Sequence, residues 1–145
     1  MKHVLLGLLL LVVVTGCNNL KEPEDPKPPM PFNRILRTPK DIWIEYLDNP
    51  TKAEKDLKET RVRFTGKLLA VDSNKYNQEI ALSLDSGLDK KHRIVIGYPE
   101  SWRSTTNKLK VGESAMIEGV YINDITDPKS GIRGLIFTGT GIFGL

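Results

Sequence analysis

The sequence has few of the side chains on which metal sites and covalent chemistry depend. It contains one cysteine, Cys17, and two histidines, His3 and His92, among 145 residues. A disulfide needs a second cysteine, and a histidine-based metal site needs a cluster that this chain cannot assemble alone. We therefore expect neither a metal nor any other cofactor.

A strong excess of charge is also missing. The chain carries 21 lysines and arginines against 18 acidic residues, for a formal net charge of +3, and aromatic residues make up only 7%. Proteins that bind polyanions through charge usually show a marked basic excess, and single-strand binders add aromatic stacking residues. The composition therefore argues against nucleic acid as the partner.

Long apolar runs are absent except at the N-terminus. Residues 1–3 form a short basic head, and residues 4–14 are apolar apart from Gly7. A membrane-spanning helix needs about 20 apolar residues, whereas the core of a secretory signal needs about 7 to 15. This pattern predicts a signal peptide over residues 1–16.

The position of Cys17 indicates its role. The stretch V-T-G-C at residues 14–17 resembles the lipobox of bacterial lipoproteins, in which the thiol receives a diacylglyceryl group and cleavage precedes the cysteine. A buried or redox-active cysteine would not be expected between an export signal and a proline-rich stretch. We predict Cys17 as the lipid attachment site, which leaves no thiol for a Cys-His pair and supports the prediction that the protein is not an enzyme.

Residues 18–31 read N-N-L-K-E-P-E-D-P-K-P-P-M-P, with frequent prolines and alternating charge. Such a segment favours extended polyproline II conformation, which at roughly 3 Å per residue would reach on the order of 40 Å. We assign residues 17–37 to the lipidated cysteine and a tether. A proline-rich ligand for a partner is the alternative, but the usual flanking anchors are missing.

Two short helices are predicted after the tether. Thr38 and Pro39 are typical of a helix start and predict a helix over residues 39–47, and Asn49-Pro50 repeats the signal. Trp43 and Tyr46 are expected to pack on the domain, with ligand stacking as the alternative, and Ala53 and Leu57 to form the contacts of the second helix.

From Arg61 the apolar period changes to two, with a phase slip expected at Gly66. Further strands are predicted at residues 79–85, 92–97, 114–123 and 134–143, with a short helix after Pro99. This order, with glycines midway along the first and fourth strands, is that of the OB-fold. We predict a mainly β domain over residues 38–145, a five-stranded antiparallel OB barrel with a short N-terminal helical segment. Its buried residues are expected to include Phe64, Leu82, Ile94, Ile96, Ile117 and Phe137.

The motifs N-P-T-K-A, V-R-F-T-G-K-L and L-K-V-G-E-S-A-M-I-E-G, behind a lipobox, resemble the tRNA_anti-like family of bacterial envelope proteins. The resemblance covers residues 40–143. It implies an OB-fold lipoprotein, and it implies no particular activity and no tRNA binding.

Strand phasing places arginines outward. If Val62, Phe64 and Ile94 point inward, then Arg61, Arg63 and Arg93 share an outer face that is basic without acids. Arginines suit carboxylates and phosphates, so these three residues are candidate ligand contacts, and Tyr76 in the first loop is a fourth. A merely solvated face is the alternative.

The loop N-D-I-T-D-P-K-S-G contains Asp124 and Asp127, a weak calcium signal that ordinary turn chemistry explains better. His92 is expected at a solvated strand edge.

The overall prediction is a membrane-anchored lipoprotein with an OB-fold binding or adaptor module in the cell envelope. Its partner would be an envelope protein or an anionic envelope polymer. The alternative is a structural or stress-related lipoprotein within a larger complex. Because Asn18 is not the aspartate that resembles an inner-membrane retention signal, we expect the outer membrane in a Gram-negative organism, and otherwise the outer face of the plasma membrane.

Overall fold

The computed structural model describes residues 33–58, 60–74 and 79–144. Along the chain these residues form β1 (Asn33–Arg37), α1 (Pro39–Asp48), α2 (Pro50–Lys58), β2 (Thr60–Asn74), β3 (Glu79–Asp85), β4 (His92–Pro99), the 3-10 turn η1 (Glu100–Trp102), α3 (Arg103–Thr106), β5 (Ser114–Thr126) and β6 (Arg133–Phe143). Cys17, the tether residues before Asn33, and Tyr76 lie outside the described residues.

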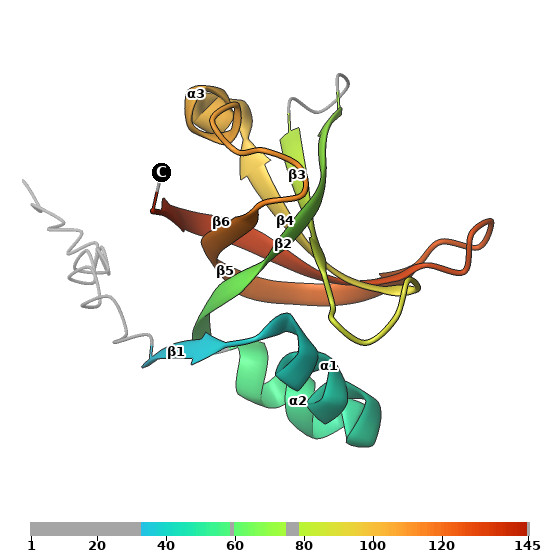
Figure 1. Ribbon diagram of the computed structural model, residues 1–145. Helices are drawn as coiled ribbons and strands as arrows, with labels where there is room; N and C mark the ends of the chain where they lie inside the picture. The colour runs from blue at the N-terminus through green and yellow to red at the C-terminus, as the bar shows by residue number, and fades with distance from the viewer. Residues whose placement is uncertain (1–32, 59, 75–78, 145) are drawn as a thin grey trace, which may run out of the picture. The chain divides into compact units, whose positions relative to one another are not determined.

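Strands β2 to β6 form a closed barrel (Figure 1). The sheet order is β1-β2-β3-β4-β6-β5, and β2 also pairs with β5, which closes the barrel. The barrel pairings are antiparallel except for β4 with β6, which run parallel. This topology, with a short helical segment between the third and fourth barrel strands, is the OB-fold, and it confirms the predicted fold class.

β1 is a strand that the sequence did not predict. Its five residues pair in parallel with Thr60–Phe64, so Arg37 lies opposite Phe64. Residues 33–37 were assigned to the tether, and their pairing places the start of the folded region earlier than residue 38. The helical hairpin between β1 and β2 provides the crossover that parallel pairing requires.

α1 and α2 begin where the capping residues indicate. The Thr38 hydroxyl accepts a hydrogen bond from the Asp41 backbone N–H at 3.1 Å, and Asn49 accepts one from Lys52 at 3.1 Å. Trp43 and Tyr46 are buried, as expected for packing residues, and the Trp43 indole donates to the Arg93 carbonyl at 3.1 Å. The hairpin therefore packs against the barrel where β4 begins.

The barrel interior contains the predicted core. Phe64, Leu82, Ile94, Ile96, Ile117 and Phe137 are all fully buried. The rings of Phe64 and Phe137 meet edge to face with centroids 4.8 Å apart. Alternation with a period of two therefore identified the inward side chains correctly.

Gly66 has a different role from the one expected. The register of β2 against β3 shifts between Leu68 and Ala70, so the irregularity lies at Leu69 and not at Gly66. A Cβ atom at position 66 would lie 3.0 Å from the Pro39 ring. The glycine therefore allows the start of α1 to approach β2 closely.

Candidate functional site

Arg61 and Arg63 lie together on the outer side of β2, next to a carboxylate of β5. Glu118 is only 2% exposed, and its Oε2 accepts a hydrogen bond from the Arg63 Nη2 at 3.0 Å. The Arg61 Nη1 lies 3.9 Å from the Glu118 Oε1, which also accepts from the Thr140 hydroxyl at 3.0 Å. The expectation of an outward face without acids is therefore wrong here, since antiparallel pairing sets Glu118 directly opposite Arg63.

The Arg63 side chain is held on a second side as well. Its guanidinium carbon lies 3.9 Å from the centre of the Phe143 ring, a cation–π arrangement. The Phe143 ring covers Gly141, where an added Cβ would lie 2.8 Å from it. These contacts connect β2 to the last strand. They occupy much of the Arg63 side chain in structural interactions.

Arg93 belongs to a different part of the barrel. It opens β4, where its register partners are Asp85 on β3 and Gly134 on β6. Neither strand neighbour is Arg61 or Arg63, which pair with Val120 and Glu118 of β5. The structure thus brings two of the three predicted arginines together and places the third elsewhere, because β2 pairs with β5 in its first half and with β3 in its second.

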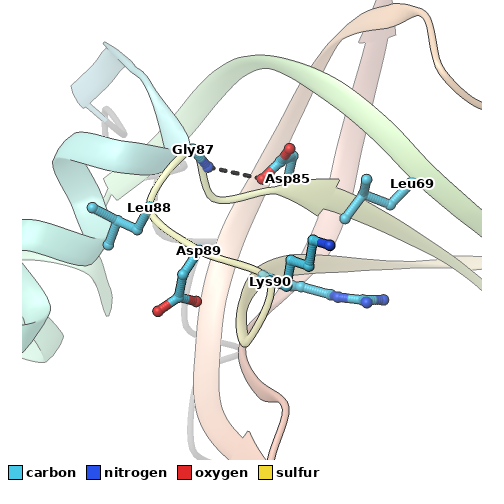
Figure 2. Close-up of a pocket in the computed structure, with 7 residues that line it drawn as sticks. Leu69, Asp85, Gly87, Leu88, Asp89 and Lys90 are labelled. Atoms are coloured by element: carbon cyan, nitrogen blue, oxygen red, sulfur yellow. Dashed lines mark hydrogen bonds between the residues drawn. The ribbon is translucent and has the colours of Figure 1, made fainter.

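A cavity of about 560 Å³ lies beside Arg93. We call it the loop groove. It is bordered by the β3–β4 loop and by the irregular position of β2, and its lining residues are Leu69, Asp85, Gly87, Leu88, Asp89, Lys90 and Arg93 (Figure 2). Because the groove combines aliphatic side chains with both cations and carboxylates, it can hold a ligand that has apolar and charged parts.

The acidic residues of the loop groove are used by the loop itself. Asp85 accepts the Gly87 backbone N–H at 2.9 Å (Figure 2), and Gly87 adopts a φ of 72° that suits glycine. Asp89 accepts from the Lys91 and His92 backbones and lies 2.9 Å from the His92 ring nitrogen. The hydrogen bond from His92, followed by those from the backbone, lowers the pKa of Asp89. Both carboxylates therefore shape the turn.

The basic residues of the groove have fewer partners. The Arg93 Nε is buried and has no hydrogen-bond acceptor within the described part of the chain. The Arg63 Nε is buried in the same way. An atom that is closed to water is closed to a ligand as well, so the buried Nε of Arg93 does not itself identify a binding site. Arg93 and Lys90 place positive charge on the lining of the groove, which favours anionic groups.

The other candidates are structural where they are described. Asp127 accepts hydrogen bonds from the Lys129 and Ser130 backbones and from the Ser130 hydroxyl, which is turn chemistry. Among residues 33–58, 60–74 and 79–144, no group of acidic, histidine or cysteine side chains is placed to hold a metal ion. Within the same ranges no helix has the length and hydrophobicity to cross a membrane.

His92 is half-buried, and its ring meets Trp43 edge to face with centroids 4.6 Å apart. The expectation of a solvated edge residue was therefore incomplete. Sequence reasoning also missed Glu118, Leu69 and Lys90. The outward position of Glu118 follows from the alternation in S-A-M-I-E-G. Its contact with Arg63, which lies 55 positions away in the sequence, can be predicted only if the register between β2 and β5 is known.

The N-terminal residues match a known functional site. Residues 1–18 match the model of the prokaryotic membrane lipoprotein lipid attachment site. The chain is a membrane-anchored lipoprotein. No curated protein matches it.

Solved structures show the same fold at low identity. A lipoprotein from Klebsiella pneumoniae, provisionally described as nucleic acid-binding, is similar with a TM-score of 0.51 and 18% identity, over 70% of this chain and 87% of that one. An OBody bound to hen egg-white lysozyme has a TM-score of 0.46 and 9% identity, over 61% and 83%. A small single-stranded DNA binding protein from Mycoplasma pneumoniae has a TM-score of 0.39 and 17% identity, over 58% and 91%. At such identities the first likeness supports the OB-fold and implies nothing about a ligand.

Proposed function

We propose that this lipoprotein is a non-catalytic binding or adaptor module of the cell envelope, and that it holds its partner at the loop groove. The observation that carries the proposal is the cavity of about 560 Å³ in which Arg93 and Lys90 place positive charge beside the aliphatic side chains of Leu69 and Leu88. Arginine in such a place is suited to a carboxylate or phosphate through paired hydrogen bonds.

Arg61 and Arg63 take a secondary place in this proposal. Glu118 already neutralises part of their charge, which weakens their attraction for an anionic partner. Tyr76 lies outside the described residues, and its role as a loop contact stays a prediction.

The proposed partner is an envelope protein or an anionic envelope polymer, and not nucleic acid. No outward position on β3 or β4 carries an aromatic ring; these positions are Glu79, Ala81, Ser83, Asp85, Arg93, Val95, Gly97 and Pro99. Single-strand binding by OB domains relies on aromatic stacking worth about 1 to 3 kcal/mol per base. The nucleic-acid description of the Klebsiella pneumoniae lipoprotein therefore has no counterpart on this face.

Two finer assignments belong to the same proposal. The motif resemblance supports membership in the tRNA_anti-like family, and Asn18 after the lipidated cysteine supports an outer-membrane position facing the periplasm in a Gram-negative cell. A role as a structural lipoprotein within a larger complex is the second candidate, because Leu36 on β1 is 69% exposed and could meet a neighbour.

A charge-reversal comparison tests the proposal. We expect Arg93→Glu with Lys90→Glu to reduce partner capture from intact envelopes and to fail to complement a deletion strain, with the wild-type contact weakening as salt rises. Lys55→Glu with Lys108→Glu is the charge-matched control, because both lysines are exposed and neither lines the groove. Unchanged capture with unchanged salt dependence would rule out the loop groove and make the loop around Tyr76 the next candidate. Stable co-purification with a complex regardless of these variants would favour the structural role.

A further inference from the structure

An aliphatic surface adjoins the loop groove on the outer side of β4, β5 and β6. Gly134 of β6 pairs with Arg93 on one side and with Ile125 on the other. A Cβ atom at position 134 would lie 3.3 Å from Val95, 3.5 Å from Ile136 and 3.8 Å from Ile125. These three side chains therefore converge over the glycine, and we call them the aliphatic floor.

The aliphatic floor is open to contact. Ile125 is 58% exposed, and Val95 and Ile136 are each partly exposed. The floor is continuous with the groove because Val95 follows Arg93 by two residues on the same face of β4. A ligand in the groove would therefore reach aliphatic carbon on one side and Arg93 on the other.

This combination suits one class of partner. Protein interfaces have an apolar centre with arginine enriched and other charges at the rim, which is the arrangement of the floor, Arg93 and Lys90. A polyanion would also be attracted to the cations. Its hydroxyl and charged groups would, however, lose their hydration on the aliphatic floor without gaining hydrogen bonds there, which disfavours its binding. The Arg93 side chain lines the groove and adds a preference for a carboxylate at one end of the contact.

We infer that the loop groove and the aliphatic floor together dock an extended protein segment, which places aliphatic side chains on the floor and an aspartate or glutamate against Arg93. The inference rests on the proposed binding role of the groove and names its partner class. It selects a protein over an anionic polymer.

The test uses the mature lipoprotein in nanodiscs and two defined probes. The first probe is a display library of short random peptides, and the second is labelled dextran sulfate. We expect selected peptides to be enriched in aliphatic residues together with an acidic residue. Their binding should survive high salt better than a purely ionic contact does, because apolar burial is not screened.

Two variants examine the two halves of the surface. Ile125→Lys should weaken the selected peptides by at least about tenfold, as expected for losing one buried aliphatic contact. Arg93→Gln should weaken acidic peptides and leave their amide counterparts unchanged. Ile44→Lys on α1 is the matched control, because Ile44 is also an exposed aliphatic residue, at 49%.

Each outcome distinguishes the inference from the proposed function. Binding of dextran sulfate that depends on Arg93 and not on Ile125 would overturn the protein-segment inference and leave the groove as the binding site. A library that yields no binders, together with dextran sulfate binding that ignores Arg93, would overturn both. Peptides that lose affinity equally in the Ile44→Lys control would also contradict the inference.

Discussion

Phe64 lies at the centre of the barrel, fully buried against Phe137. We expect Phe64→Ala to destabilise the domain by roughly 3 to 5 kcal/mol, because the substitution removes a large buried side chain and leaves a cavity that β2 and β6 cannot close. Urea denaturation followed by circular dichroism measures the change. A variant as stable as the parent would contradict the assigned core.

Glu118 gives a second prediction at the scale of a residue. Its carboxylate is buried among Arg61, Arg63 and Thr140, so Glu118→Ala leaves two guanidiniums together without their counter-charge. We expect a loss of about 1 to 3 kcal/mol of stability, because the hydrogen bonds to the buried carboxylate are lost while the Arg61 and Arg63 side chains, 35% and 28% exposed, stay partly screened by water. Glu113→Ala is the control, because the Glu113 side chain is 66% exposed and lies 3.8 Å from Lys110, a contact worth little. Equal effects of the two substitutions would show that the cluster is not stabilising.

These two residues also show how far sequence reasoning reached. Phe64 was identified as buried because alternation along one strand is a local property. The surroundings of Glu118 were not identified, since its partners come from β2 and β6 and depend on the register of both pairings. The separation of Arg93 from Arg61 and Arg63 was missed for the same reason.

At the scale of elements, β1 was the strand that the sequence did not reveal. The stretch N-R-I-L-R lacks clear alternation and follows a proline-rich segment, and its parallel partner lies beyond two helices. The helices and the barrel strands were predictable because their caps, prolines and periodicity are local signals. Parallel pairing across a crossover leaves no such signal in so short a strand.

β1 leads to a prediction about where the folded region begins. A soluble form that begins at Thr38 loses β1 and the Arg37–Glu45 ion pair, and it exposes the edge of β2 at residues 60–64. Compared with a form that begins at Asn18, we expect it to be less stable by about 1 to 2 kcal/mol, since lost backbone pairing exceeds the conformational entropy regained. We also expect it to self-associate through the exposed edge. Denaturation and sedimentation velocity measure the two effects, and a monomer of unchanged stability would mean that β1 contributes nothing to the domain.

The contact between the helical hairpin and the barrel leads to a prediction about pH. The Asp124 carboxylate accepts from the Arg133 Nη2 at 2.9 Å, and the Arg133 guanidinium lies 5.2 Å from the Tyr46 ring centre on α1. The hydrogen bond from Arg133 lowers the pKa of Asp124 below its ordinary value of 3.8. The pair therefore stabilises the fold at any pH above that ordinary value, and its contribution is lost as the pH falls through the lowered pKa.

Asp124→Asn should make stability less dependent on pH in the acid range below pH 4, with the largest difference from the parent near neutrality. Thermal unfolding at a series of pH values measures this. Asp72→Asn is a control, because Asp72 is an exposed residue for which no ion pair is seen among the described residues. Parallel pH profiles for the parent and Asp124→Asn would contradict the role of the ion pair.

At the scale of the whole molecule, the chain combines a lipid attachment site at its N-terminus with an OB-fold domain. Cys17 is the residue on which we expect the attachment to depend. Each buried methylene of an acyl chain contributes about 0.8 kcal/mol, and stable anchoring needs more than one chain. Without acyl chains, this site would therefore not anchor the protein stably in a bilayer. The order of the strands could be predicted from the sequence because five alternating segments and one short helix fit few β topologies. The ligand could not be predicted, because a fold does not determine the chemical groups on its surface.

Cys17→Ala should abolish lipidation and leave a precursor that retains residues 1–16 or is mislocalised. Mass spectrometry of the wild-type protein should find an acylated Cys17 as the mature N-terminus, and fractionation should recover it with membranes. Asn18→Asp is the control, because it keeps the cysteine: it should still be lipidated, and in a Gram-negative host it should shift the protein toward the inner membrane if the outer-membrane assignment holds. A wild-type N-terminus other than acylated Cys17, or normal processing of Cys17→Ala, would contradict the assignment of Cys17 as the lipid anchor. It would also contradict the proposal that the domain meets its partner at the membrane to which Cys17 is attached.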